Sequence, residues 1–200
     1  VAASVQDPAL RQSRSWQKIG FRTLVSEVAY RMGLEAAFYL MDGTDPVYDT
    51  VVQGEETDIN FLSRRCWLEG CALMFRNDQA VVASLSGIDG AAPNGYRLSV
   101  GPKASRAFTV LGYGSCTVTD GSVNATVTSG LGKMDLVYHT QEPLSSIEEA
   151  RRFASNILDE KNRGLRTGVI YSNDLLPELT AGTKFTVDTP PYHDRLAVAT

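Results

Sequence analysis

Few residues of this sequence combine the types and the spacing that catalysis or metal binding requires. The two histidines, His139 and His193, lie in separate predicted elements, whereas a zinc site needs Cys and His at short, repeated intervals. Glu55, Glu56 and Asp58 could supply a carboxylate pair for glycoside cleavage. They also precede a predicted helix, where the helix dipole favours negative charge. We therefore predict no catalytic, cofactor-binding or metal-binding residues.

Other potentially reactive motifs have structural interpretations. The run Gly112-Tyr113-Gly114-Ser115-Cys116 contains a serine between glycines, but it lacks the Gly-x-Ser-x-Gly order and the strand–turn–helix context of a nucleophile elbow. We predict a glycine-rich turn there. The sequence also contains no phosphate-binding loop, dinucleotide fingerprint or metalloprotease helix. The cysteines, Cys66, Cys71 and Cys116, cannot form a disulfide framework and are predicted to be reduced, buried thiols.

Length and composition indicate an ordinary globular protein. A chain of 200 residues with 43% hydrophobic residues can bury a useful core as one large domain or two small ones. The net charge of −4, with scattered basic residues, argues against a surface dedicated to nucleic-acid binding. No apolar run reaches the roughly 20 residues of a membrane span. The N-terminus lacks an initiator Met and a signal-peptide pattern, so we expect the chain to be part of a longer protein.

The pattern predicts an α+β domain over residues 23–85, preceded by a linker or the end of another domain over residues 1–22. Within residues 1–22, Arg11 to Lys18 is polar and predicts a loop or edge segment. A helix, a glycine and an apolar strand occur twice within the domain. The first copy is Thr23–Leu40, with Thr23 as the expected N-cap, and the second is Thr57–Phe75. Two such units predict two helices on one face of a small sheet.

The second copy carries the clearest local signals. Thr57 is a good N-cap, Ile59, Leu62 and Cys66 share one helical face, and a glycine follows the helix. A β-hairpin around Asn77-Asp78 comes next.

Residues 86–200 predict a mostly antiparallel β-barrel or split barrel, interrupted by a helix at 145–163. We expect that helix to begin at a capping box, Ser145-x-x-Glu148, and to end at Gly164. The predicted strands are short and are separated by turn residues: Tyr96–Val100, Phe108–Leu111, Cys116–Thr119, Val123–Thr128, Met134–His139, Gly168–Tyr171, Lys184–Val187 and Leu196–Ala199.

The 145–163 helix is expected to be amphipathic. Its buried face is predicted to contain Ile147, Ala150, Ala154, Ile157 and Leu158. The opposite, solvated face is predicted to contain Glu148, Glu149, Arg151, Arg152, Asp159 and Lys161.

The central segment resembles a known family. Its pattern, Gln-x-x-Glu-Thr-Asp-Ile-x-Phe-Leu-x-Arg-Arg followed by a glycine and an apolar hairpin, is similar to that of phage baseplate hub proteins of the late control D family. These proteins are related to the hub part of type VI secretion spike proteins. The resemblance is carried by Gln53, Glu56, Thr57, Asp58, Phe61, Leu62, Arg64 and Gly70. It extends over residues ~13–200 through Leu179-Thr180-Ala181-Gly182 and Asp194-Arg195-Leu196-Ala197-Val198, although the first barrel usual in the family is absent.

The resemblance implies a structural role. Hub proteins of this family form a ring, usually a trimer, that joins the tail tube to a membrane-piercing spike. It therefore implies a homotrimer in a phage tail or a phage-like contractile injection particle, assembled in the bacterial host cytoplasm. Its partners would be tail tube, spike and other baseplate proteins, and DNA would pass through the lumen without specific binding. The resemblance brings no catalytic residues and no cofactor.

Two functions from other classes remain open. One is a peptidoglycan-degrading enzyme attached to the tail, which would need a carboxylate or Cys/His constellation in a cleft. The other is a monomeric receptor- or carbohydrate-binding β domain at the tail tip.

Overall fold

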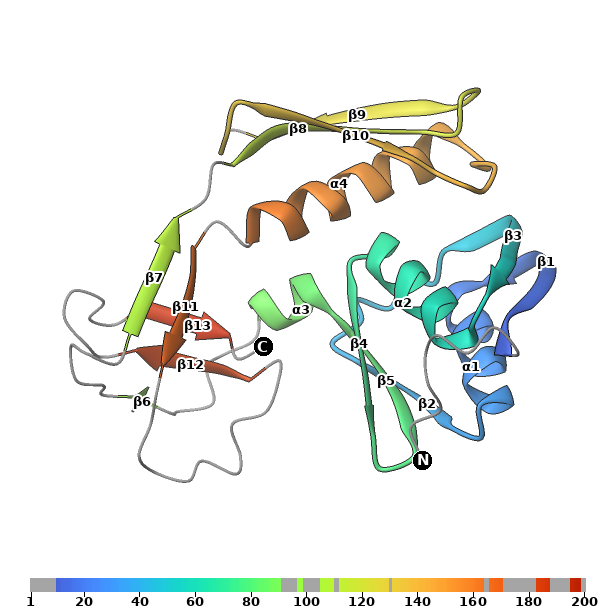
Figure 1. Ribbon diagram of the computed structural model, residues 1–200, viewed down its shortest axis with the longest axis horizontal. Helices are drawn as coiled ribbons and strands as arrows, with labels where there is room; N and C mark the ends of the chain where they lie inside the picture. Colours follow the sequence, from blue (N-terminus) through green and yellow to red (C-terminus); the bar gives the residue numbers. More distant parts are fainter. Residues whose placement is uncertain are drawn as a thin grey trace.

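The computed structural model describes residues 10–90, 97–98, 105–109, 112–129, 131–163, 166–170, 183–187 and 195–198. These residues form an α+β fold with four helices (Figure 1). Their sheets are three three-stranded mixed sheets and two two-stranded sheets. Two parts form most of the core: an N-terminal region, residues 12–90, and an α4 region, residues 112–163.

The N-terminal region begins with a two-stranded ribbon. Strand β1 (Gln12–Gly20), which lies within the predicted linker, pairs antiparallel with β3 (Val47–Glu56). Helix α1 (Phe21–Arg31) and strand β2 (Glu35–Tyr39) lie between them in the chain. The face of β1 that carries Trp16 packs inward, because the Trp16 ring stacks on Phe61 at a centroid distance of 5.3 Å.

The predicted Thr23 cap of the first helix is wrong. Helix α1 starts at Phe21, and its N-cap, Gly20, makes no side-chain hydrogen bond. The first amides are satisfied from the 42–46 loop instead: Phe21 N donates to the Pro46 carbonyl at 2.9 Å, and Arg22 N donates to an Asp45 carboxylate oxygen at 2.8 Å. Sequence-distant acceptors therefore cap this helix, and a local motif could not predict them.

The paired helix–glycine–strand units are confirmed. Gly33 and Gly70 follow their helices with φ of +75° and +65°, the left-handed conformation that glycine adopts at low cost. Strands β4 (Cys71–Arg76) and β5 (Gln79–Ser84) form the predicted hairpin around Asn77-Asp78, and β2 joins β5 in parallel. Helix α1 contacts β2, and α2 (Asp58–Leu68) contacts β4 (Figure 1).

Helix α2 largely follows its predicted pattern. The Thr57 hydroxyl accepts from Asn60 N at 3.3 Å, which confirms the N-cap. Leu62 and Cys66 are buried as predicted, while Ile59 is only partly buried.

The α4 region is a sheet covered by one long helix. Strands β8 (Tyr113–Thr119) and β9 (Asn124–Thr128) form an antiparallel hairpin, and β10 (Met134–His139) joins β8 in parallel. Helix α4 (Ile147–Arg163) runs across one face of this sheet (Figure 1). The interface is apolar and contains the buried side chains Cys116, Val118, Ala125, Ala150, Phe153, Ala154 and Ile157.

The remaining described elements are short. Helix α3 (Leu85–Gly90) follows β5. Strand β7 (Ser105–Thr109) pairs antiparallel with β11 (Arg166–Ile170). Strand β12 (Lys184–Val187) lies between β13 (Arg195–Val198) and β6 (Arg97–Leu98).

The predicted barrel needs correction. The described strands of residues 86–200 form three separate small sheets, and none of these sheets closes into a barrel. They are also less antiparallel than predicted, because β10 joins β8, and β12 joins β6, in parallel. Turn signals predict where strands begin and end, but parallel pairing joins strands through longer connections that such signals do not reveal.

The start of α4 lies one residue later than predicted. The Ser146 hydroxyl accepts from Glu149 N at 3.1 Å, and a Glu149 carboxylate oxygen accepts from Ser145 N at 2.7 Å. The sequence fits a capping box at Ser145 and Glu148 and equally one at Ser146 and Glu149, because the serines and the glutamates are each consecutive. Glu149 is consequently 7% exposed rather than solvated, and Ile147 is 52% exposed rather than inward-facing. Gly164 lies outside the described residues.

The glycine-rich run near Ser115 is a strand rather than the predicted turn. Tyr113 to Cys116 belong to β8. A Cβ on Gly114 would lie 2.5 Å from the Gly132 carbonyl oxygen, so the close approach of these two backbones requires glycine.

The prediction of free, buried thiols at all three cysteines is confirmed. Among the described residues, no helix combines the length and apolar character needed to cross a membrane.

Candidate functional site: a polar joint between the two regions

Glu142 lies at the centre of the contact between the N-terminal and α4 regions. It belongs to the 140–146 loop, which connects β10 to α4, and its side chain is only 7% exposed. One carboxylate oxygen, Oε1, pairs with Arg64 and with Arg65 Nη1, the latter at 3.5 Å. The other, Oε2, accepts from the backbone amide of Val52 at 2.9 Å. A single carboxylate therefore ties the loop to both β3 and α2. We call this contact and its neighbours the joint.

Arg64 links the joint to the start of its own helix. Its guanidinium donates to Glu56 Oε1 at 2.5 Å and to the Val52 carbonyl at 3.2 Å. Burial disfavours the charged form of Arg64, but hydrogen bonds and the charges of Glu56 and Glu142 outweigh that effect. The pKa of Arg64 therefore lies above its ordinary value.

Arg65 is the most deeply buried cation in the joint. Its side chain is 3% exposed, and its guanidinium carbon lies 4.4 Å from the Tyr48 ring centroid and 5.6 Å from that of Phe153. Aromatic faces attract a guanidinium at such distances. Tyr48 comes from β3 and Phe153 from α4, so Arg65 bridges the two regions.

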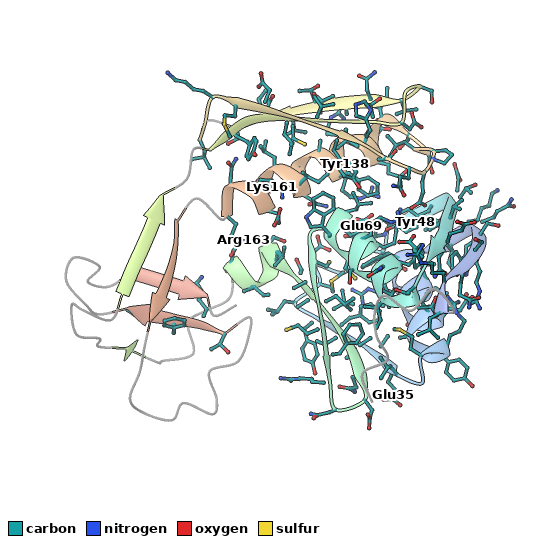
Figure 2. All side chains as sticks on the ribbon, viewed as in Figure 1. Glu35, Tyr48, Glu69, Tyr138, Lys161 and Arg163 are labelled. Carbon is teal, nitrogen blue, oxygen red and sulfur yellow. The ribbon has the colours of Figure 1, made fainter. Side chains whose placement is uncertain are left out.

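A second set of contacts holds α4 directly against the N-terminal region. Arg152 forms a two-point ion pair with Glu69, with Nε–Oε2 and Nη2–Oε1 distances of 2.9 and 3.1 Å. The Tyr48 hydroxyl donates to the same carboxylate at 2.6 Å (Figure 2). Burial raises the pKa of Tyr48, so this phenol remains a neutral donor. The prediction that Arg152 belongs to a solvated face is wrong, because the side chain reaches across the interface.

Gly70 allows α4 to approach closely. A Cβ at this position would lie 2.9 Å from the side chain of Asn156, whose amide donates to the Leu68 carbonyl at 2.9 Å. The glycine thus has two roles, since it also takes the left-handed conformation that ends α2.

Several of the residues that carry the resemblance to hub proteins hydrogen-bond or form ion pairs with one another. Gln53 Nε2 donates to Asp58 Oδ1 at 2.8 Å and to the Glu56 carbonyl at 3.0 Å. Asp58 also pairs with Arg31 at 3.2 Å, so these groups hold β3, α2 and α1 together. Because Glu56 and Asp58 are engaged by arginines, they do not form a free acid–base pair.

Sequence reasoning missed Glu142, Arg65 and Arg152. Glu142 lies in a loop 78 residues after its partner Arg64 and carries no motif. Arg65 had one available signal, because it falls on the same helical face as the predicted core positions Leu62 and Cys66. A buried arginine predicts a buried acidic partner, but it does not identify which one.

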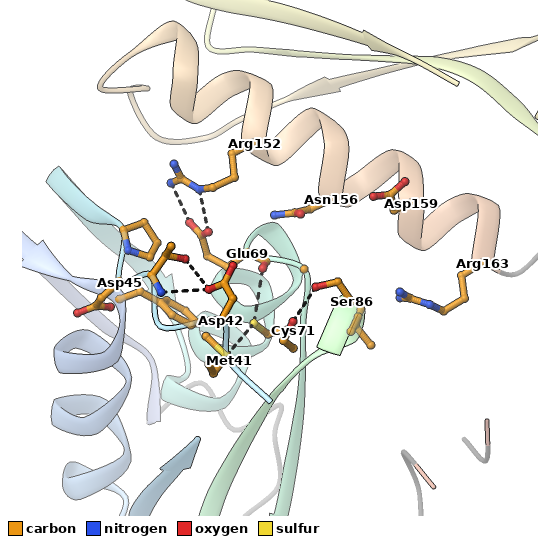
Figure 3. Close-up of a pocket in the computed structure, with 16 residues that line it drawn as sticks. Met41, Asp42, Asp45, Glu69, Cys71, Ser86, Arg152, Asn156, Asp159 and Arg163 are labelled. Atoms are coloured by element: carbon orange, nitrogen blue, oxygen red, sulfur yellow. Dashed lines mark hydrogen bonds and ion pairs between the residues drawn. The ribbon is translucent and has the colours of Figure 1, made fainter. Parts of the chain in front are cut away.

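A groove of about 490 Å³ lies beside the joint, with α4 as one wall (Figure 3). Its other walls are the 41–46 loop, the end of α2 and the β5–α3 junction. The lining residues are Phe21, Met41, Asp42, Thr44, Asp45, Pro46, Glu69, Gly70, Cys71, Ser84, Leu85, Ser86, Arg152, Asn156, Asp159 and Arg163.

Among its described lining residues, the groove pairs no nucleophile with a base. Burial raises the pKa of the Cys71 thiol to about 12, and the sulfur contacts Met41 Sδ at 3.9 Å rather than a histidine. Glu69 is occupied by its ion pair, and Arg163 pairs with Asp89 at 2.6 Å. Within the part of the chain that the structure describes, no three His, Cys, Asp or Glu residues cluster as metal ligands. His139 is exposed on β10, and His193 lies outside the described residues.

The fold is similar to that of three tail proteins, two of them from prophages. The 43 kDa tail protein of prophage MuSo2 from Shewanella oneidensis superposes with a TM-score of 0.64 at 16% identity, over 98% of this chain and 62% of that one. The tail protein from Neisseria meningitidis MC58 gives 0.63 at 11% identity, over 94% and 63%. Prophage tail protein gp18 from Listeria monocytogenes EGD-e gives 0.57 at 12% identity, over 94% and 61%.

These similarities concern the fold. The chain spans about three fifths of the length of each of these tail proteins. No protein-family model and no curated protein sequence matches it.

Proposed function

We propose that this chain is a structural component of a phage tail or of a phage-like contractile injection particle. The observation that carries the proposal is the shared fold, which covers 94–98% of the chain in three tail proteins. The joint agrees with a structural role. Its arginines and carboxylates neutralise one another across elements and bury apolar rings between them. These charged groups hold the chain in shape rather than presenting free reactive groups.

Within the tail, we propose the baseplate hub as the location, between the tail tube and the central spike, with the chain in a homotrimer. The support is the resemblance of residues 53–70 to late control D hub proteins. Four of the eight residues that carry it, Gln53, Glu56, Asp58 and Arg64, make the hydrogen bonds and ion pairs of one network, and Thr57 caps α2 beside it.

The hub proposal is tested by the mass of the native full-length protein that contains this chain. A stable trimer supports the hub, while a monomer favours the receptor- or carbohydrate-binding alternative. A cell-wall lysis assay on the same preparation separates the hub from the peptidoglycan-degrading alternative.

The proposal also predicts the character of the ring's bore. A mildly acidic protein, with a net charge of −4, would let DNA pass without trapping it. Residues that face the lumen of the assembled ring should therefore be acidic or neutral. A bore lined by lysine and arginine would contradict this part of the proposal.

A further inference from the structure

The guanidinium of Arg65 has unmet hydrogen-bonding capacity. It carries five N–H donors, yet among the described residues its hydrogen bonding is limited to the 3.5 Å contact of Nη1 with Glu142 Oε1. Nε and Nη2 have no hydrogen-bond partner among the described residues, although the side chain is only 3% exposed. The rings of Tyr48 and Phe153 lie against the guanidinium carbon, and neither residue is a hydrogen-bond partner of Nε or Nη2. Buried donors of this kind are rarely left without a protein or water partner.

A small cavity lies beside this side chain. Its volume is about 10 Å³, and its lining includes Arg65, Glu142, Glu149 and Thr140. A cavity of about 10–15 Å³ holds one water molecule if two to four polar groups surround it. Both conditions are met, since Arg65 supplies donors and the two carboxylates supply acceptors.

We propose that one structural water occupies this cavity, accepting from Arg65 and donating to a neighbouring carboxylate. Glu149 is 7% exposed and has acceptor capacity left, because the hydrogen bond that its carboxylate accepts from Ser145 N uses only Oε2. The second possible acceptor, Glu142, contacts Arg65 directly. This assignment does not depend on the tail function.

The cavity favours water over an anion. Arg64 and Arg65 contribute two positive charges to its lining, and Glu142 and Glu149 contribute two negative charges. A neutral ligand keeps that balance, whereas chloride would face two carboxylates. The size of the cavity also matches a single small molecule. The bound water adds to the hydrogen bonding of a guanidinium whose contact with the Glu142 carboxylate is long, at 3.5 Å.

The test observes water at Arg65 by NMR of the intact ¹⁵N-labelled chain. The Arg65 Nε–H signal is assigned from its loss in Arg65→Lys, with Arg64→Lys as the matched control. We expect a cross peak to water whose laboratory-frame and rotating-frame Overhauser effects have opposite signs, as for a water that stays bound far longer than surface water does. Proton exchange keeps the diagonal's sign in both experiments and is thereby distinguished. No Overhauser cross peak, or one with the signs of surface water, overturns the proposal.

A high-resolution crystal structure of the unsubstituted chain provides a second test that does not depend on any variant folding. We expect one ordered peak within hydrogen-bonding distance of Nε or Nη2 of Arg65. The same crystal soaked in bromide should show no anomalous signal in this cavity. An empty cavity overturns the site, and bound bromide overturns its assignment to water.

Discussion

Replacing Glu142 with alanine should destabilise the protein more than any surface substitution. The change removes the ion-pair partner that Arg65, which is 3% exposed, has among the described residues, and it leaves the Val52 amide without its acceptor. Breaking a buried ion pair from one side costs about 3–5 kcal/mol. For a protein of this size, about 1 kcal/mol corresponds to roughly 2–4 °C in Tm. We therefore expect Tm to fall by roughly 6–20 °C.

Urea unfolding followed by tryptophan fluorescence measures this loss. Trp67 is a suitable reporter, because its ring packs edge-on against Tyr138 of the α4 region at 5.2 Å. The matched control is Glu148→Ala, which removes an exposed carboxylate from the first turn of α4, six residues after Glu142. It should change the free energy of unfolding by no more than about 0.5 kcal/mol.

A double-mutant cycle separates the ion pair from the rest of the joint. Arg65→Met should cost less than Glu142→Ala, because Glu142 keeps its contact with Arg64. The double variant should cost less than the sum of the two, since no unpaired charge remains in it. If Glu142→Ala falls within about 0.5 kcal/mol of the unsubstituted protein, or if the two costs simply add, the joint does not hold the regions together as described.

Three further predictions test other parts of the fold. Gly70→Ala should cost more than Gly43→Ala in thermal unfolding: both glycines have positive φ, but only at Gly70 would the added Cβ meet α4; equal costs would argue against the close approach. Ser146→Ala should lower the free energy of unfolding by about 1 kcal/mol, because α4 loses its N-cap. An unchanged free energy in chemical denaturation would indicate that Ser145, not Ser146, is the N-cap. The Leu144 amide, followed by those of the β8–β9 turn, holds the pKa of Asp120 below its ordinary value, so its stabilising effect is present above pH ~4 and disappears as pH falls through the folded-state pKa. Asp120→Asn should therefore destabilise the protein at pH 7, and by progressively less in unfolding measured at lower pH; a loss independent of pH would contradict this.

Signals that act within a few residues predicted the local structure well. The Thr57 cap, the glycines that end α1 and α2, and the Asn77-Asp78 turn all appear where the sequence indicates them. Each depends on the dihedral preference or hydrogen-bonding reach of one residue. Such preferences are encoded locally and survive in the folded chain.

Features that depend on distant partners were predicted less well. The first helix is capped by Asp45 and Pro46, more than 20 residues after its start, so Thr23 is not needed as a cap. Strand direction in the second half also depends on which strands meet. The β10–β8 pair is parallel although both strands read like members of a meander. A series of short antiparallel strands predicts a barrel, but the described strands of residues 86–200 pair into separate sheets.

The sequence indicates the residues on one side of the joint but not their partner, Glu142. Residues 53–64 formed a recognisable pattern, and the structure shows that Glu56, Asp58 and Arg64 belong to one network. The carboxylate that completes the network, Glu142, lies in a loop without a motif. Its importance arises from burial beside two arginines, which only the tertiary structure reveals.

The most direct test of the structural role is an electron cryomicroscopy map of the intact parent particle with this chain located in it. We expect three copies in a ring at the junction of tail tube and spike, with the Glu142–Arg65 contact intact in every copy. Density for the chain as an isolated domain at the tail tip, or its absence from the particle, would refute the proposed hub role.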